Sequence, residues 1–142
     1  MAAPNIVAVS TIRGKSNVAN LTTTSSSIVV NPVNSGQVFK INTIMISNVD
    51  GTNSGNVSVE LFKFGAQNTS TGSGNATYGI ANNMTVPAKS SLDVMSKSLY
   101  LEEGDQLKAK ADSNNRLHLI TSFEEISSWP KVSTAVLLEQ ET

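Results

Sequence analysis

The sequence predicts an all-β protein: a single antiparallel β-sandwich, jelly-roll-like or immunoglobulin-like, with extended N- and C-terminal arms. Apolar and polar residues alternate with a period of two from end to end, and no segment shows a sustained helical stripe. Ser, Thr and Asn, which favour turns and exposed strand faces, are abundant, whereas charged residues make up only 15%. Short extended runs recur about every 8–12 residues with turn residues between them, which is typical of a sandwich of either topology.

The N-terminal half contains five of the expected strands. They cover residues 6–12, 18–23, 27–31, 38–49 and 57–64. Arg13-Gly14-Lys15 and Asn34-Ser35-Gly36 are expected to be turns, because glycine and asparagine tolerate the backbone conformations that turns need. The Gly/Asn/Asp-rich segment 50–55 is expected to close a hairpin between the last two of these strands.

The C-terminal half contains six shorter runs. They cover residues 77–81, 84–86, 92–95, 99–101, 106–111 and 117–123, after a loop at 65–75. Residues that alternate on one face of these strands are expected to form the core. The expected core is Ile41, Val57, Val59, Leu61, Leu92, Val94, Leu99, Leu101, Leu107, Leu117, Leu119 and Phe123.

We expect a sandwich domain over residues 1–127 and a C-terminal arm over 128–142. In the arm, Trp129 precedes Pro130, which favours an extended exit from the domain, and apolar residues follow. The arm either folds back as an edge strand or lies on a neighbouring subunit. The second alternative makes the termini an interface, for which the candidate residues are Ile6, Val7, Val9, Trp129, Val132, Val136, Leu137 and Leu138.

Charge and composition argue against several classes of partner. The net charge is -1 and the basic residues are scattered, which disfavours nucleic-acid binding. No apolar run approaches the roughly 20 residues of a membrane-spanning helix, so no membrane partner is expected. The start MAAPNIVAVS lacks the features of a signal peptide. The chain contains no Cys, which removes disulfides and thiolate chemistry, and we expect no cofactor.

Three features resemble catalytic or metal sites, but a structural role explains each of them better. Glu102, Glu103 and Asp105 lie in a turn, where adjacent side chains point to opposite faces and do not converge on a substrate. His118 alternates with leucines on a strand and has no evident catalytic partner. The segment 50–56 superficially resembles a calcium loop but lacks the further acidic ligands. We therefore expect no enzymatic activity and no metal site.

Three stretches carry a resemblance to a known family. They are APNIVAVSTIRGKS, GQVFKINTIMISNVDGTNSGNVSVELF, and VPAKSSLDVMSKSLYLEEGDQLKAKA with the later FEEIS. These stretches resemble small virion structural proteins of tailed phages, notably marine and cyanobacterial ones. The resemblance covers most of residues 1–127, and the arm from Ser128 has no match in it. It implies a virion component assembled in the cytoplasm of a bacterial host, and it brings no active-site residues.

Within that family, a small and nearly neutral sandwich suits repeated docking on a symmetric lattice. The first interpretation is a capsid decoration (cement) protein, a homotrimer that docks on the major capsid protein. The second is a neck, tail or baseplate component of the same particle. The third, from another class, is a carbohydrate-binding adhesin module, which is disfavoured because aromatic residues make up only 5% of the chain.

Overall fold

The computed structural model describes residues 9–65 and 74–128, and the described residues form nine strands. The strands are β1 (Val9–Asn20), β2 (Ser26–Val30), β3 (Gln37–Asn48), β4 (Gly55–Lys63), β5 (Ala76–Val86), β6 (Ser91–Asp93), β7 (Leu99–Leu101), β8 (Gln106–Ala111) and β9 (Leu117–Ser128). Within this part of the chain no helix is long and apolar enough to cross a membrane.

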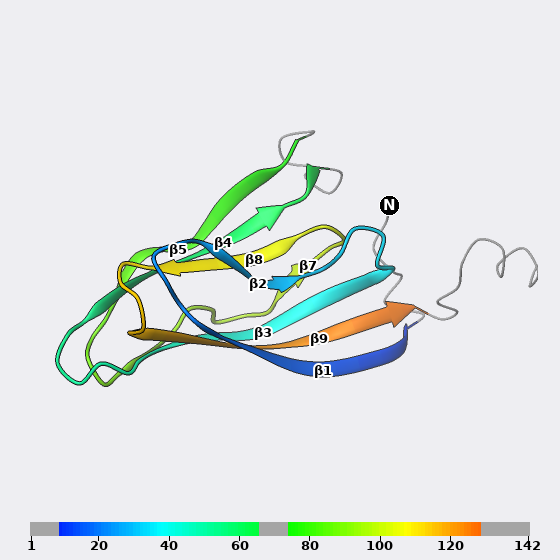
Figure 1. Ribbon diagram of the computed structural model, residues 1–142. Coiled ribbons are helices and arrows are strands. Elements are labelled where there is room, and N and C mark those ends of the chain that lie inside the picture. The colour runs from blue at the N-terminus through cyan, green and yellow to red at the C-terminus, as the bar shows by residue number, and fades with distance from the viewer. Residues whose placement is uncertain (1–8, 66–73, 129–142) are drawn as a thin grey trace, which may run out of the picture.

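The strands form two antiparallel sheets, which confirms the predicted β-sandwich. Sheet A has the order β1-β9-β3-β6, and β7 also pairs with β3; sheet B has the order β2-β8-β4-β5. Figure 1 shows the sheets as two layers, with β1, β9 and β3 below β8, β4 and β5. Apart from the β4–β5 and β6–β7 connections, successive strands alternate between the sheets. This order is that of a jelly roll, so the structure decides between the two topologies that the sequence left open.

Two segments that were predicted to be turns between paired strands have a different role in the structure. Arg13-Gly14-Lys15 lies inside β1, which pairs with β9 without a register shift from Thr11 to Asn20, so one long strand replaces two short ones. Tertiary pairing with β9 overrides the local turn preference of Gly14. Residues 50–55 do not close a hairpin, because β3 belongs to sheet A and β4 to sheet B. The segment is a connection that crosses between the two layers.

Strand boundaries also differ from the predictions, most clearly for β5, β6 and β9. Residues 77–81 and 84–86 belong to one strand, β5, which is interrupted by register shifts opposite Val59 rather than by a turn. β6 covers Ser91–Asp93 instead of residues 92–95. β9 continues past Phe123 to Ser128, where it pairs with Val9. The sandwich therefore includes Ser128, one residue beyond the expected domain boundary.

The core lies between the two sheets and contains every residue that alternation predicted. Eight of these residues are buried, and Leu61, Leu92, Val94 and Leu99 are partly buried against them. Ile44 and Ile46 are also buried, although they were not among the expected core residues. A register shift in β3 between Ile41 and Thr43 changes which parity faces inward, so Ile41 and Ile44 point into the same core. A strictly alternating pattern cannot reveal such a shift.

Candidate functional site

The outer face of sheet A carries an apolar row that crosses three strands. Val18 of β1 pairs with Ile120 of β9, and Ile120 pairs with Met45 of β3. We call these three residues the outer row. Val18 is 75% exposed and Ile120 36% exposed, although both lie within long, paired strands. Adjacent exposed apolar side chains of this kind mark surfaces that contact another molecule.

A shallow depression of about 320 Å³ adjoins the outer row. Its lining comes from two paired strands: Val18, Ala19 and Asn20 of β1, with His118, Leu119 and Ile120 of β9. His118, the single histidine of the chain, therefore lies at an apolar surface, and it belongs to a strand as expected. The depression and the outer row share Val18 and Ile120, so they form one continuous apolar surface across β1, β9 and β3.

β1 is an open edge strand along this surface. It pairs with β9 on one side, and no described strand pairs with its other side. Its residues from Thr11 to Ser16 are all exposed. Such an edge presents backbone N–H and C=O groups that can pair with another extended segment. In Figure 1, β1 lies along the outer border of the lower layer.

Basic side chains lie on the opposite face of β1 from the outer row. Arg13 Nη1 is 3.8 Å from Glu125 Oε1, and Lys15 Nζ is 3.1 Å from Glu125 Oε2. The side chains of Arg13 and Lys15 are 67% and 44% exposed, whereas that of Glu125 is 12% exposed. Two cations thus share one carboxylate on this face of β1.

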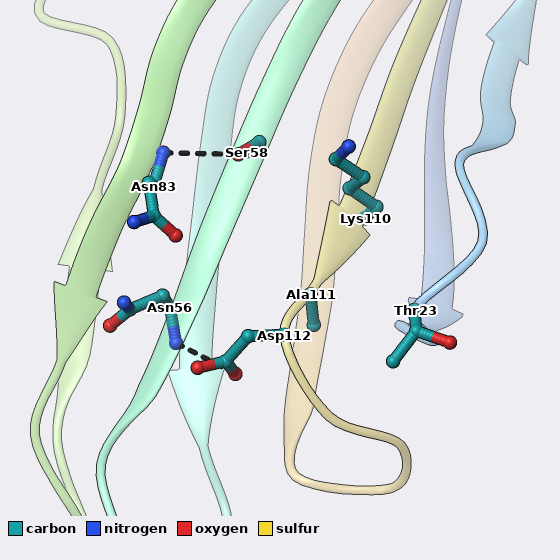
Figure 2. Close-up of a pocket in the computed structure, with 7 residues that line it drawn as sticks. All are labelled: Thr23, Asn56, Ser58, Asn83, Lys110, Ala111 and Asp112. Carbon is teal, nitrogen blue, oxygen red and sulfur yellow. Dashed lines mark hydrogen bonds between the residues drawn. The ribbon is translucent and has the colours of Figure 1, made fainter.

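The outer face of sheet B is polar and hollowed. One pocket of about 300 Å³ is lined by Thr23, Asn56, Ser58, Asn83, Lys110, Ala111 and Asp112 (Figure 2). A second pocket of about 350 Å³ shares Ser58 and Lys110 with it. Two hydrogen bonds shape the first pocket: Asn83 N donates to Ser58 Oγ at 3.0 Å, and Asn56 N donates to Asp112 Oδ1 at 3.1 Å. Amides, hydroxyls and single charges of this kind can form hydrogen bonds with polar ligands.

The acidic turn, Glu102, Glu103 and Asp105, is a structural junction. Lys63 Nζ contacts Glu102 Oε1 at 2.6 Å and Asp105 Oδ2 at 2.8 Å. Glu103 points elsewhere, because its Oε2 accepts a hydrogen bond from Gly36 N at 2.8 Å. The prediction that Glu102 and Glu103 do not converge is thus confirmed. Their neighbour Asp105 has no exposed surface, a burial that no local pattern of the sequence predicts.

Hydrogen bonds from three directions hold the Asp105 carboxylate. Its Oδ1 accepts from Phe64 N at 3.0 Å, and its Oδ2 accepts from Glu102 N at 2.9 Å and from Lys63. Burial of the ammonium acts to lower the pKa of Lys63, but its hydrogen bonds to Asp105 and Glu102 prevail and raise that pKa above its ordinary value. These contacts tie the end of β4 to the turn that precedes β8.

The loop after β3 uses its acidic residue to order its own backbone. Asp50 Oδ1 accepts hydrogen bonds from Thr52 N at 2.8 Å and Asn53 N at 3.0 Å, and Oδ2 accepts from Arg116 Nε at 3.1 Å. These backbone hydrogen bonds hold the pKa of Asp50 well below its usual range. Across residues 9–65 and 74–128, no group of three His, Cys, Asp or Glu side chains is placed to hold a metal ion.

Most of the predicted interface residues lie outside the described part of the chain. These residues are Ile6, Val7, Trp129, Val132, Val136, Leu137 and Leu138. Val9 is described by its backbone alone, which begins β1 and pairs with Ser128. The outer row was not predicted as a contact surface. Its signal was present in the sequence, because Ile120 occupies a position of LHLITSF where alternation calls for a polar residue.

No protein-family model and no curated protein matches this chain. Among solved structures, it is similar to a chain in the acid-stable capsid of Helicobacter pylori bacteriophage KHP30, with 12% identity and a TM-score of 0.49 over 84% of this chain and 91% of that one. A chain of infectious bursal disease virus strain Gx matches with 6% identity and a TM-score of 0.48 over 86% of this chain. This chain spans 31% of that viral chain.

A third similar structure comes from a study of Bacillus endospore appendages, described as disulfide-linked pili. The match has 11% identity and a TM-score of 0.44, and it covers 83% of this chain and 87% of that one. All three likenesses concern the fold at low sequence identity. No residue of this chain is assigned a role from them.

Proposed function

We propose that the chain is a non-enzymatic structural protein of a phage virion, a capsid decoration protein that assembles as a homotrimer and docks on the head lattice. The observation that carries the proposal is the outer row of Val18, Ile120 and Met45 beside the open edge of β1. An exposed apolar surface on a small sandwich with few charges is suited to burial against another subunit. Closed cyclic assemblies are the common way in which identical subunits bury such a surface.

Two further arguments support a virion role. The sequence resembles small virion structural proteins of tailed phages over most of residues 1–127. The jelly-roll order of the strands is also the order that viral capsid domains use, although the same fold serves lectins and enzymes. The major capsid protein is then the expected partner. A place in the neck, tail or baseplate is the alternative within the same particle.

The number of copies per particle tests this proposal. The source phage is purified, and the chain is quantified in intact particles by mass spectrometry against labelled peptides. A decoration protein is expected in hundreds of copies, because it follows the symmetry of the head, whereas neck or baseplate proteins occur in roughly a dozen or fewer. Absence from purified particles would contradict the virion role altogether.

The polar hollow on sheet B supports one candidate from a different class, a carbohydrate-binding adhesin module. Its two pockets offer Asn56, Ser58, Asn83 and Lys110 as hydrogen-bonding groups. Their linings include no aromatic side chain on which a sugar ring could stack, which makes this candidate the weaker one. A glycan array probed with the full chain tests it. Binding that is lost in Lys110→Ala and Ser58→Ala would favour the adhesin.

A further inference from the structure

The four outer borders of the two sheets differ in how well they resist pairing with another strand. In sheet B, β2 is short and β5 contains two register shifts, and both features hinder strand addition. In sheet A, one border consists of the three-residue strands β6 and β7. The remaining border, β1, is long and pairs regularly with β9. Among the described strands, β1 is therefore the edge most open to an added strand.

The C-terminal arm has the composition of a strand that matches this edge. After Pro130 its sequence is KVSTAVLLEQET. Every second residue from Val132 to Leu138 (Val132, Thr134, Val136 and Leu138) is β-branched or apolar, which favours a strand with these side chains on one face. Its charged residues are Lys131, Glu139 and Glu141, so the arm carries net negative charge. The exposed charges of Arg13 and Lys15 on β1 are of the opposite sign.

We propose that residues 134–142 of one copy add as an antiparallel strand to the open edge of β1 of a second copy. In this register Glu139 lies opposite Lys15, and Glu141 lies opposite Arg13. Both pairs fall on the same face of the sheet, because each strand alternates with a period of two. This inference rests on the proposed function, since it names how the copies of a homo-oligomer are joined.

The same register brings apolar residues together on the other face. Val136 lies opposite Val18, so it extends the outer row of Val18, Ile120 and Met45 by one residue. Cross-strand pairs of β-branched residues and of opposite charges each stabilise a sheet by a modest amount. A single register thus pairs opposite charges on the basic face of β1 and apolar side chains on its other face.

Chain length excludes donation to the arm's own sandwich in this register. Ser128 pairs with Val9 at one end of β1, whereas Thr134 would lie opposite Asn20 at the other end. The separation along β1 is about 35 Å at the usual rise of a strand. The five residues between Ser128 and Thr134 can span only about 20 Å when fully extended. The strand must therefore come from another copy.

Pairing of two β1 strands with each other is disfavoured by the same charges. An antiparallel β1 pair centred on Gly14 would place Arg13 of one copy opposite Lys15 of the other, and like charges directly opposite are destabilising. An arm that reaches from each copy to the next makes a head-to-tail contact. Such contacts close into a ring when the rotation between subunits permits, as in a trimer.

Disulfide trapping tests the inference, because the natural chain contains no cysteine. Two full-length single variants, Val18→Cys and Val136→Cys, are mixed, oxidised and separated on a non-reducing gel. A heterodimer linked between the two variants is expected as the main product, because directly opposite residues approach closely enough for a disulfide. Met84→Cys on the distant edge strand β5, mixed with Val136→Cys, is the control. A yield no higher than in this control would overturn the inference.

Two further measurements separate the remaining outcomes. The double variant Val18→Cys with Val136→Cys is oxidised in one chain at low concentration, and an exclusively intrachain disulfide would overturn donation between copies. Lys15→Glu is expected to raise the concentration at which the oligomer dissociates by about fivefold to tenfold, and Glu139→Lys in the same chain should restore it. Failure of both charge effects would overturn the register.

The outcome of disulfide trapping is independent of the outcome of the copy-number experiment. Trapping without incorporation into particles would support strand donation and contradict the virion role. Incorporation without trapping would support the virion role and contradict strand donation.

Discussion

Lys63 Nζ lies 2.8 Å from Asp105 Oδ2, and this ion pair joins the end of β4 to the turn that precedes β8. Asp105 has no exposed surface and also accepts hydrogen bonds from the backbone of Phe64 and Glu102. One carboxylate thus ties together two segments that lie about forty residues apart in the chain.

Removing this carboxylate should destabilise the sandwich. Asp105→Ala leaves a mostly buried ammonium and two backbone N–H groups without their acceptor, at a cost of about 3–5 kcal/mol in the free energy of unfolding. Glu102→Gln should cost less than about 1 kcal/mol, because the Glu102 side chain is 37% exposed and its ion pair is screened by water. Urea denaturation of both variants makes the comparison. Equal losses would contradict the structural role of Asp105.

Gly104 should resist substitution more than the neighbouring turn glycine. Its φ is +89°, and an added Cβ would lie 2.5 Å from Cγ of Phe64. Gly36 has a φ of +69° but open space around it. Gly36→Ala is expected to cost about 1–2 kcal/mol of backbone strain. Gly104→Ala should cost about 1–3 kcal/mol more, because it also overpacks Phe64. Thermal melting should give a lower melting temperature for Gly104→Ala than for Gly36→Ala. Equal melting temperatures would contradict this prediction.

Two adjacent residues of β9 should differ sharply in their contribution to stability. Leu119 is fully buried between the sheets, whereas Ile120 belongs to the outer row and is 36% exposed. Leu119→Ala should cost about 2–5 kcal/mol through lost burial and a cavity. Ile120→Ala should change the unfolding free energy of a dilute, monomeric sample by less than about 1 kcal/mol. If Leu119→Ala keeps the melting temperature of the natural protein, the inward face of β9 is assigned wrongly.

Asp50, in the loop after β3, should make the free energy of unfolding depend on pH. The pKa of Asp50 lies below the ordinary value of 3.8 because the backbone N–H groups of Thr52 and Asn53, together with their side chains, donate hydrogen bonds to its carboxylate. A lowered pKa means that its stabilising effect is present above the unfolded-state value and is lost as pH falls through the folded-state value.

Asp50→Asn should therefore be less stable than the natural protein near pH 7, with the difference shrinking toward about pH 2. Urea midpoints at the two pH values measure the effect. Asp93→Asn, which alters an exposed carboxylate on β6, is the matched control. A difference that stays constant with pH would show that the Asp50 carboxylate does not act through its charge.

Deletion of residues 129–142 should leave a folded sandwich that fails to assemble. β9 ends at Ser128, so its pairing with β1 and β3 is complete without the arm. Sedimentation velocity is expected to show a monomer, and circular dichroism should show the β-sheet spectrum of the full chain. Assembly like that of the full chain would place the interface elsewhere. Unfolding of the shortened chain would show that the arm is an intramolecular strand.

The sequence by itself determined that the twelve expected core residues would face the layer between the sheets. Alternation alone identifies Leu117, Leu119 and Phe123 as inward residues, because a strand half buried in a sandwich must repeat every two residues. Gly104 and the acids around it were correctly placed in a turn for the same local reason, since glycine adopts a positive φ at little cost. These features depend on neighbours in the chain.

Tertiary structure alone decided which strands pair and what the edges present. The glycine turn expected at Gly14 disappears because β9 pairs with β1 along its whole length. The loop at residues 50–55 looks like a hairpin locally, but its flanking strands belong to different sheets. The partner of Asp105 is Lys63, which lies far away in the sequence, and the outer row joins one residue from each of three strands. Contacts between segments distant in sequence depend on strand order and register, which no local pattern encodes.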